Sequence, residues 1–115
     1  MASDLPTVSF ETEAALRAWL ERHHDTSAGI WVRVARRSAG VPSVTFEQLL
    51  EQGLCFGWSE SSRRRGDGPF YLQRFTPRRS KGTTSARNVR LAERLSAEGK
   101  MTAAGREALG LAGRG

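Results

Sequence analysis

The spacing of hydrophobic residues changes along the chain, and this change restricts the fold more than any other feature. Residues 11–24 repeat apolar side chains every three or four positions, which predicts an amphipathic helix with the stripe Leu16, Trp19, Leu20 and His23. Residues 29–37 instead alternate, with β-branched residues at every second position, which predicts a strand. Residues 45–55 return to the helical period and begin with Thr45 and Gln48, spaced as a capping box. A chain with both periods must pack helices against a sheet.

The second half of the chain predicts a hairpin followed by one more helix. Strands are expected at 56–62 and 70–76, joined by the Gly-rich tip RRRGDGP, and a helix at 84–98 between an N-cap at Thr84 or Ser85 and Gly99. We therefore predict an α+β fold in which a small, mainly antiparallel sheet packs against about three helices in a single two-layer domain. We expect a flexible N-terminus over residues 1–9, the domain over 10–101, and a short helix or disordered tail over 102–115.

Composition excludes several classes of protein. One cysteine, Cys55, rules out an internal disulfide framework, and two adjacent histidines without a second ligand pair make a metal site unexpected. The N-terminal residues lack a basic segment followed by an apolar run, and no stretch approaches the roughly 18 apolar residues of a membrane span. We expect a cytoplasmic protein without a transmembrane segment, metal or cofactor.

Charge is unevenly distributed along the sequence. Residues 1–60 carry five arginines against eight carboxylates, a net charge of −3, whereas residues 61–115 carry thirteen basic residues against four carboxylates, a net charge of +9. Such a basic half attracts an anionic partner, which could be nucleic acid, a phosphate-bearing ligand or an anionic lipid surface. The alternative is a basic surface that is simply solvated.

Aromatic and basic residues alternate most densely between residues 58 and 88. Single-stranded nucleic-acid binders combine such residues, since bases stack on aromatic rings while arginines neutralise phosphate. In this interpretation Trp58 and Tyr71 stack, the basic side chains supply charge, and Gln73 adds a neutral donor. The expected ligand-binding set is Trp58, Tyr71, Gln73, Arg74, Arg78, Arg79, Lys81 and Asn88. Alternatively, Trp58, Phe70, Leu72 and Phe75 fill the core and the arginines cover its rim.

Only weak candidates for catalysis are present. Glu60 and Tyr71 could transfer a proton in an enzyme that clamps a small anionic metabolite with its arginines. However, the positive charges near Glu60 in sequence should keep it ionised through pairing with Arg74 or Arg78. The sequence has no second carboxylate close by, no phosphate-binding Gly-rich loop and no nucleophile elbow. A non-enzymatic role is therefore favoured.

Several motifs resemble one family. The segments WLERHHDTSAGIWVRVAR, VTFEQLLEQGL, LCFGWSES and FYLQRFTPRRSKGTTSARNVRLAERLSAEGKM, which together cover about residues 10–105, resemble the YdeI/OmpD-associated bacteriocin-protection family. The chain departs from that pattern at Ser59, Glu60 and Thr84, where the family commonly has Ile, Asp and Trp. The resemblance implies a link to antimicrobial-peptide resistance and to an outer-membrane porin, but no molecular activity.

The net charge of the chain affects how it could act in antimicrobial-peptide resistance. With a net charge of +6 and a pI of about 11.0, the protein should repel a cationic peptide at long range. We therefore expect an anion-binding module for a nucleotide, nucleic acid or phosphorylated ligand. The alternative is a protein-interaction module that binds a cationic peptide or porin partner through an acidic patch on the first helix, formed by Glu11, Glu13, Glu21 and Asp25.

Overall fold

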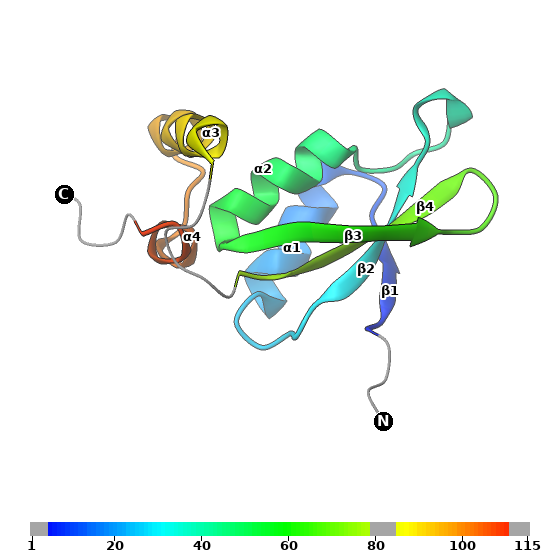
Figure 1. The fold of residues 1–115 in the computed structure, drawn as a ribbon, viewed down its shortest axis with the longest axis horizontal. Coiled ribbons are helices and arrows are strands. Elements are labelled where there is room, and N and C mark those ends of the chain that lie inside the picture. Colours follow the sequence, from blue (N-terminus) through cyan, green and yellow to red (C-terminus); the bar gives the residue numbers. More distant parts are fainter. Residues whose placement is uncertain (1–4, 79–84, 111–115) are drawn as a thin grey trace.

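The structure, a computed structural model, describes residues 5–78 and 85–110. Helices and strands alternate in the first half, and a hairpin and two helices form the second (Figure 1). In chain order the elements are β1 (Thr7–Ser9), α1 (Glu13–His23), β2 (Ile30–Ala35), the short 3-10 helix η1 (Arg37–Ala39), α2 (Phe46–Phe56), β3 (Trp58–Arg65), β4 (Phe70–Pro77), α3 (Ala86–Ala97) and α4 (Ala103–Ala108).

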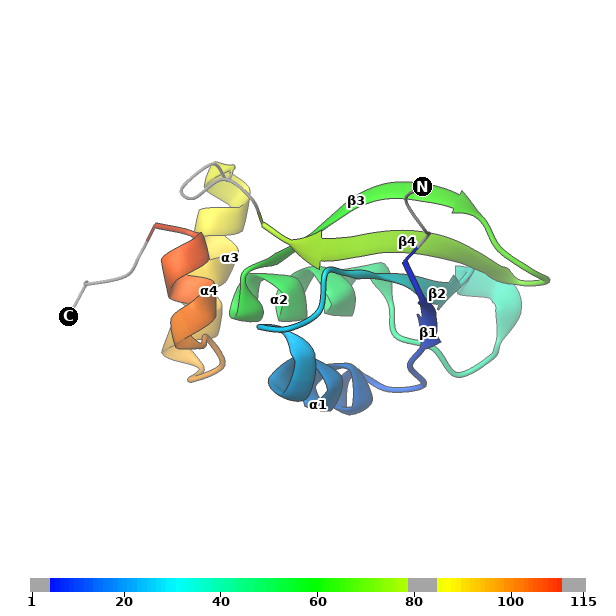
Figure 2. The ribbon, with the colours of Figure 1, turned by 90° about the horizontal axis from the view of Figure 1, so that it is seen from below.

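The four strands form one sheet in the order β1-β2-β4-β3. β2 and β3 both run antiparallel to β4, whereas β1 runs parallel to β2. Figure 2 shows α1 and α2 on one face of this sheet and α3 and α4 beside one end of it. This arrangement confirms the predicted α+β fold with a mainly antiparallel sheet packed against helices.

The N-terminal segment differs in detail from the sequence-based expectation, whereas the C-terminal segment contains a short helix. Residues 7–9 were expected to be flexible, but they form β1, held where the Trp31 N–H donates to the Pro6 carbonyl at 2.8 Å. Three residues are too few to show a hydrophobic period, so this strand depends on its partner. Within the expected short helix or tail, Ala103–Ala108 is helical and is capped by the Thr102 hydroxyl.

The core lies between the sheet and α1 and α2, and it also receives residues from α3. Side chains that are 2% exposed or less include Leu16, Leu20, Ile30, Val32, Leu49, Leu54, Trp58, Phe75 and Leu95. Cys55 belongs to this core, where burial raises the pKa of its thiol, as expected of a small buried residue. Among the described residues, no helix has the length and apolar character needed to cross a membrane.

Helix α2 is fixed at both ends by its own sequence. At its start the capping box is complete, because the Thr45 hydroxyl accepts from the Gln48 N–H and the Gln48 side chain accepts from the Thr45 N–H, both at 3.1 Å. At its end Gly57 has a φ of +78°, and a Cβ there would meet Ala104 and Ala108 of α4. The chain can therefore turn directly from α2 into β3.

Candidate anion-binding site

Two residues of the expected site are buried and make their contacts within the protein. Trp58 is 1% exposed, packs 5.0 Å from the Phe75 ring and donates its indole N–H to the His24 carbonyl at 3.2 Å. Gln73 is also 1% exposed, and its amide nitrogen donates to the Ser62 and Arg74 carbonyls. The expected stacking role of Trp58 is therefore wrong for this structure, since its ring is covered.

The remaining expected residues are spread over different parts of the fold. Arg74 lies over the Trp31 ring at 5.9 Å, Arg78 follows the end of β4, and Asn88 lies in the first turn of α3, where its N–H donates to the Ser85 hydroxyl. Arg79 and Lys81 lie outside the described residues. The described part of the set therefore does not form one site.

Tyr71 does lie in a setting suited to an anion. Its half-buried ring faces the Arg63 guanidinium at 4.5 Å and the Arg36 guanidinium at 5.8 Å. Arg63 also lies over the Phe46 ring at 5.1 Å, and its Nε–H donates to the Gln73 side-chain oxygen at 3.0 Å. Two half-buried rings and two arginines thus form an arginine–aromatic stack from α2 across the sheet.

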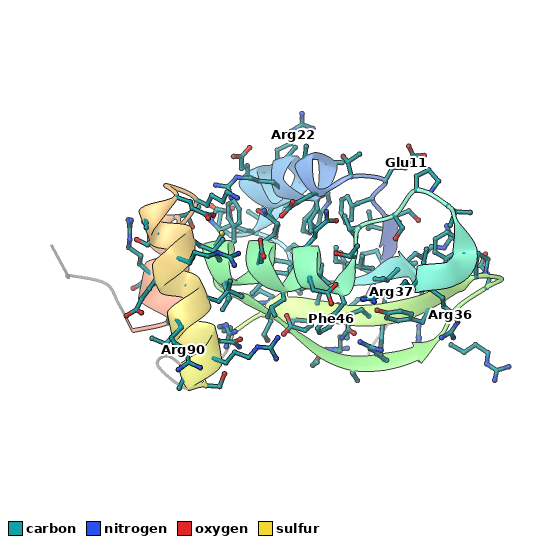
Figure 3. All side chains as sticks on the ribbon, turned by 90° about the horizontal axis from the view of Figure 1, so that it is seen from above. Glu11, Arg22, Arg36, Arg37, Phe46 and Arg90 are labelled. Carbon is teal, nitrogen blue, oxygen red and sulfur yellow. The ribbon has the colours of Figure 1, made fainter. Side chains whose placement is uncertain are left out.

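A cavity of about 290 Å³ borders this stack. Apolar side chains of β2 and of the loop before α2 form part of its wall, and its charged and hydroxyl-bearing lining residues are Arg36, Arg37, Ser43, Thr45, Glu47 and Tyr71. Figure 3 shows Arg36, Arg37 and Phe46 on the same side of the molecule, whereas Arg22 and Arg90 lie on α1 and α3. We call this space the Tyr71 cavity.

Local sequence places these side chains around the Tyr71 cavity. Directly after β2, the Arg36 N–H donates to the Pro69 carbonyl, which holds Arg36 against the start of β4. The Ser43 hydroxyl accepts from the Ala35 N–H and donates to the Val44 carbonyl, so it ties the loop to the end of β2. The capping box at Thr45 makes Phe46 the first residue of α2.

Electrostatics at the Tyr71 cavity favour an anion. Within the described residues, Arg36, Arg37 and Arg63 have no carboxylate partner, and Glu47 is the one carboxylate in the lining. Some arginines elsewhere do meet a carboxylate: Arg17 meets Glu21 at 3.6 Å, and Arg33 meets Asp67 and Arg94 meets Glu51, each at 2.9 Å. The cavity therefore carries local positive charge that no neighbouring carboxylate neutralises fully.

Glu60 lies apart from the Tyr71 cavity lining, and its pKa shifts in the direction opposite to the one expected. Burial raises the pKa of its carboxyl above the ordinary value of 4.5, and the nearby Arg78 guanidinium only partly opposes this shift. The expectation that neighbouring charge would prevent a raised pKa is wrong, because desolvation is the largest effect. Glu60 Oε2 and Arg78 Nε are both buried, and neither has a hydrogen-bond partner among residues 5–78 and 85–110.

Sequence reasoning missed Arg36, Arg37, Phe46 and Glu47 as parts of a site. Two adjacent arginines at the end of a predicted strand and an aromatic residue directly after an N-cap were visible signals. Their meeting depends on the antiparallel pairing of β2 with β4, which the sequence does not specify. Among the described residues, no group of three or more His, Cys, Asp or Glu side chains could hold a metal ion.

Fold and site together define a small α+β domain with an arginine-rich cavity at one end of its sheet. The chain belongs to the family described as "Domain of unknown function (DUF8412)", whose model matches residues 8–108. That description names no activity and does not bear on the resemblance to the bacteriocin-protection family. No curated protein and no solved structure matches the chain.

Proposed function

We propose that this protein is a binding module for an aromatic anion of nucleotide type, with the Tyr71 cavity as its site. One observation carries the proposal: Arg36 and Arg63 lie over the half-buried Tyr71 and Phe46 rings, Arg37 lines the adjoining cavity, and none of the three has a carboxylate partner among the described residues. Two other surface arginines, Arg33 and Arg94, do meet carboxylates.

The chemistry of these side chains matches the two parts of a nucleotide. Guanidinium groups bind phosphate through paired hydrogen bonds, and Arg36 and Arg37 are exposed enough to do so. A base can stack on an arginine plane or on an aromatic ring, and both border the cavity. A volume of about 290 Å³ is at the lower end of ligand pockets, which favours a single nucleotide over a larger cofactor.

Other functions have less support from the geometry. For the cationic-peptide alternative, two of the four carboxylates are engaged, since Glu13 accepts from Gln52 at 2.9 Å and Glu21 meets Arg17 at 3.6 Å. For the enzyme alternative, Glu60 does not line the cavity that Tyr71 lines. A role in antimicrobial-peptide resistance rests on the family resemblance alone, and we propose that any such role acts through the bound anion.

Tyr71 supplies a direct test because it is the one tyrosine of the chain. Protein labelled with fluorotyrosine gives one signal, which we expect adenosine monophosphate to shift in a saturable way. Adenosine is chosen because its amino group can donate to Glu47. The variant Arg36→Gln should weaken binding about tenfold, equivalent to about 1.4 kcal/mol.

A matched variant separates site binding from general charge. Arg22→Gln removes the same charge from an exposed position on α1, away from the Tyr71 cavity (Figure 3), and should leave the affinity unchanged. A Tyr71 signal that does not move at millimolar nucleotide, or equal losses in the two variants, would overturn the proposal.

A further inference from the structure

Exposed arginines continue from the Tyr71 cavity onto the edge of the sheet. β3 is an edge strand, and Arg63, Arg64 and Arg65 are exposed at its end. Arg65 pairs in register with Tyr71, and the Arg36 N–H reaches Pro69 next to the start of β4. The arginines after β2 and those at the end of β3 therefore lie at the same end of the sheet.

A β-bulge sets the direction of these arginines. The register of β3 against β4 shifts between Glu60 and Arg63, so that Arg63 faces Gln73 and Arg65 faces Tyr71. Alternate residues of a strand share a face and are about 6.6 Å apart. Arg63 and Arg65 thus form a short row on the cavity side of the edge, where each could meet one phosphate of an extended strand.

The same edge offers neutral hydrogen-bonding groups. Ser61 and Ser62 are exposed within the bulge, and in the described sheet the outer backbone groups of β3 have no neighbouring strand. Serine hydroxyls and backbone N–H groups are common phosphate contacts beside arginine. Asp67, the carboxylate at the hairpin tip, accepts hydrogen bonds from Arg33 with both oxygens. This pairing reduces the repulsion between Asp67 and a bound anion.

We infer that the ligand of this site is a single-stranded nucleic acid. One base would enter the Tyr71 cavity, and phosphates on either side would lie on Arg37 and on the Arg63 and Arg65 row. A single strand fits because the base must expose a ring face to the stack, whereas a base within a duplex is stacked on both faces. This inference rests on the proposed function and extends it from one nucleotide to a chain.

Length and salt dependence test the inference. An oligoadenylate of about eight nucleotides, within the site sizes of known single-strand binders, should bind at least tenfold more tightly than adenosine monophosphate. Contacts to about three phosphates should make log K fall with log salt concentration with a slope of about −2. Binding would be measured by fluorescence anisotropy of the labelled oligonucleotide and by the fluorotyrosine signal.

The variant Arg65→Gln separates the two proposals, because Arg65 does not line the Tyr71 cavity. It should weaken oligonucleotide binding roughly threefold to tenfold and reduce the salt slope by about one, without changing the affinity for the mononucleotide. Arg22→Gln, on α1, is the control and should change neither affinity.

Each result points to one proposal. If neither ligand moves the Tyr71 signal, the proposed function itself fails. If the mononucleotide binds but the oligonucleotide binds no more tightly, or if Arg65→Gln behaves as Arg22→Gln, only the inference of a single-strand ligand is overturned. The inference of a single-strand ligand would also be overturned if a duplex containing the same sequence bound with equal affinity at the same salt concentration.

Discussion

Glu60 is a carboxylate whose ionisation is governed by burial more than by the charge beside it. Its pKa is raised although Arg78 attracts the ionised form, so the surroundings as a whole favour the neutral form. The folded protein therefore holds more protons than the unfolded chain from the ordinary value of 4.5 up to the raised pKa. Stability contributed by protonated Glu60 is present below this window and is lost as pH rises through it.

The variant Glu60→Gln tests whether stability falls as Glu60 ionises, because glutamine reproduces the neutral form at every pH. We expect higher stability than the parent at neutral pH and a smaller decline in the unfolding free energy from acidic to neutral pH. Urea denaturation across this range measures both. Glu93→Gln, at an exposed position on α3, should leave the pH profile of the parent in place. A Glu60 variant that is less stable at neutral pH would mean that attraction to Arg78 outweighs burial.

Single residues also show which site features the sequence could predict. Tyr71 was expected to contact a ligand, and it lines the cavity. The burial of Trp58 was one of the two alternatives that the sequence left open, and the burial of Gln73 was not expected, since alternation along a strand reveals two faces without saying which one meets the helices. The bulge between Glu60 and Arg63 adds to this difficulty, because it changes the facing residues part-way along β3.

Helix α4 depends on a close approach to α2 at Gly105. The N–H and the hydroxyl of Thr102 both donate to the Cys55 carbonyl, which fixes the start of α4 on the last turn of α2. A Cβ at Gly105 would collide with the backbone carbonyls of Cys55 and Leu54. These atoms belong to a buried helix and cannot move like the end of a flexible side chain.

The variant Gly105→Ala compares two opposing effects, the higher helix propensity of alanine and the steric collision of its Cβ with α2. Helix propensity alone would make alanine more stable by about 1 kcal/mol, whereas overpacking of this kind costs about 1–3 kcal/mol. We expect the collision to dominate, so that Gly105→Ala lowers the unfolding free energy measured with urea. Ala103→Gly, at an exposed position of α4, should cost about 1 kcal/mol or less through propensity. Stabilisation by Gly105→Ala would show that α4 does not lie this close to α2.

At the level of elements, the sequence predicts those helices and strands that are long enough to show a repeat of hydrophobic residues. The helices α1 and α2 and the strands β2 and β4 are long enough to carry such a pattern, and all were expected near their observed positions. β1 has three residues, and its place depends on a hydrogen bond from Trp31 to Pro6. α4 is also short, with six residues, and it depends on packing against α2 for its stability.

On the scale of the whole molecule, charge is arranged differently from its order in the sequence. The acidic first half supplies Arg36 and Arg37 to the most arginine-rich end of the sheet, where they join Arg63 and Arg65. Part of the basic second half is neutralised across a groove between α2 and α3, since Arg94 pairs with Glu51. Among the described residues, Arg36, Arg37, Arg63 and Arg65 have no carboxylate partner and gather at the hairpin end, so the division at residue 60 is not a division in space.

This arrangement predicts how the folded state responds to anions. Like charges at the hairpin end repel one another, so any salt should stabilise the protein slightly by screening. An anion that bridges several guanidiniums should do more, because binding to the folded state at a hundred times its Kd adds about 2.7 kcal/mol. For a domain of this size, that corresponds to an increase in Tm of about 10 °C.

Tripolyphosphate and sodium chloride at equal ionic strength distinguish binding from screening. We expect tripolyphosphate to raise Tm more than chloride, and the double variant Arg36→Gln/Arg37→Gln to lose most of this difference because two binding groups are gone. The same variant should melt at a higher temperature than the parent in low salt, since less repulsion remains. Arg22→Gln on α1 should retain the full difference between the two salts. Equal increases from both salts would mean that the arginines at this end only repel one another and bind no multivalent anion.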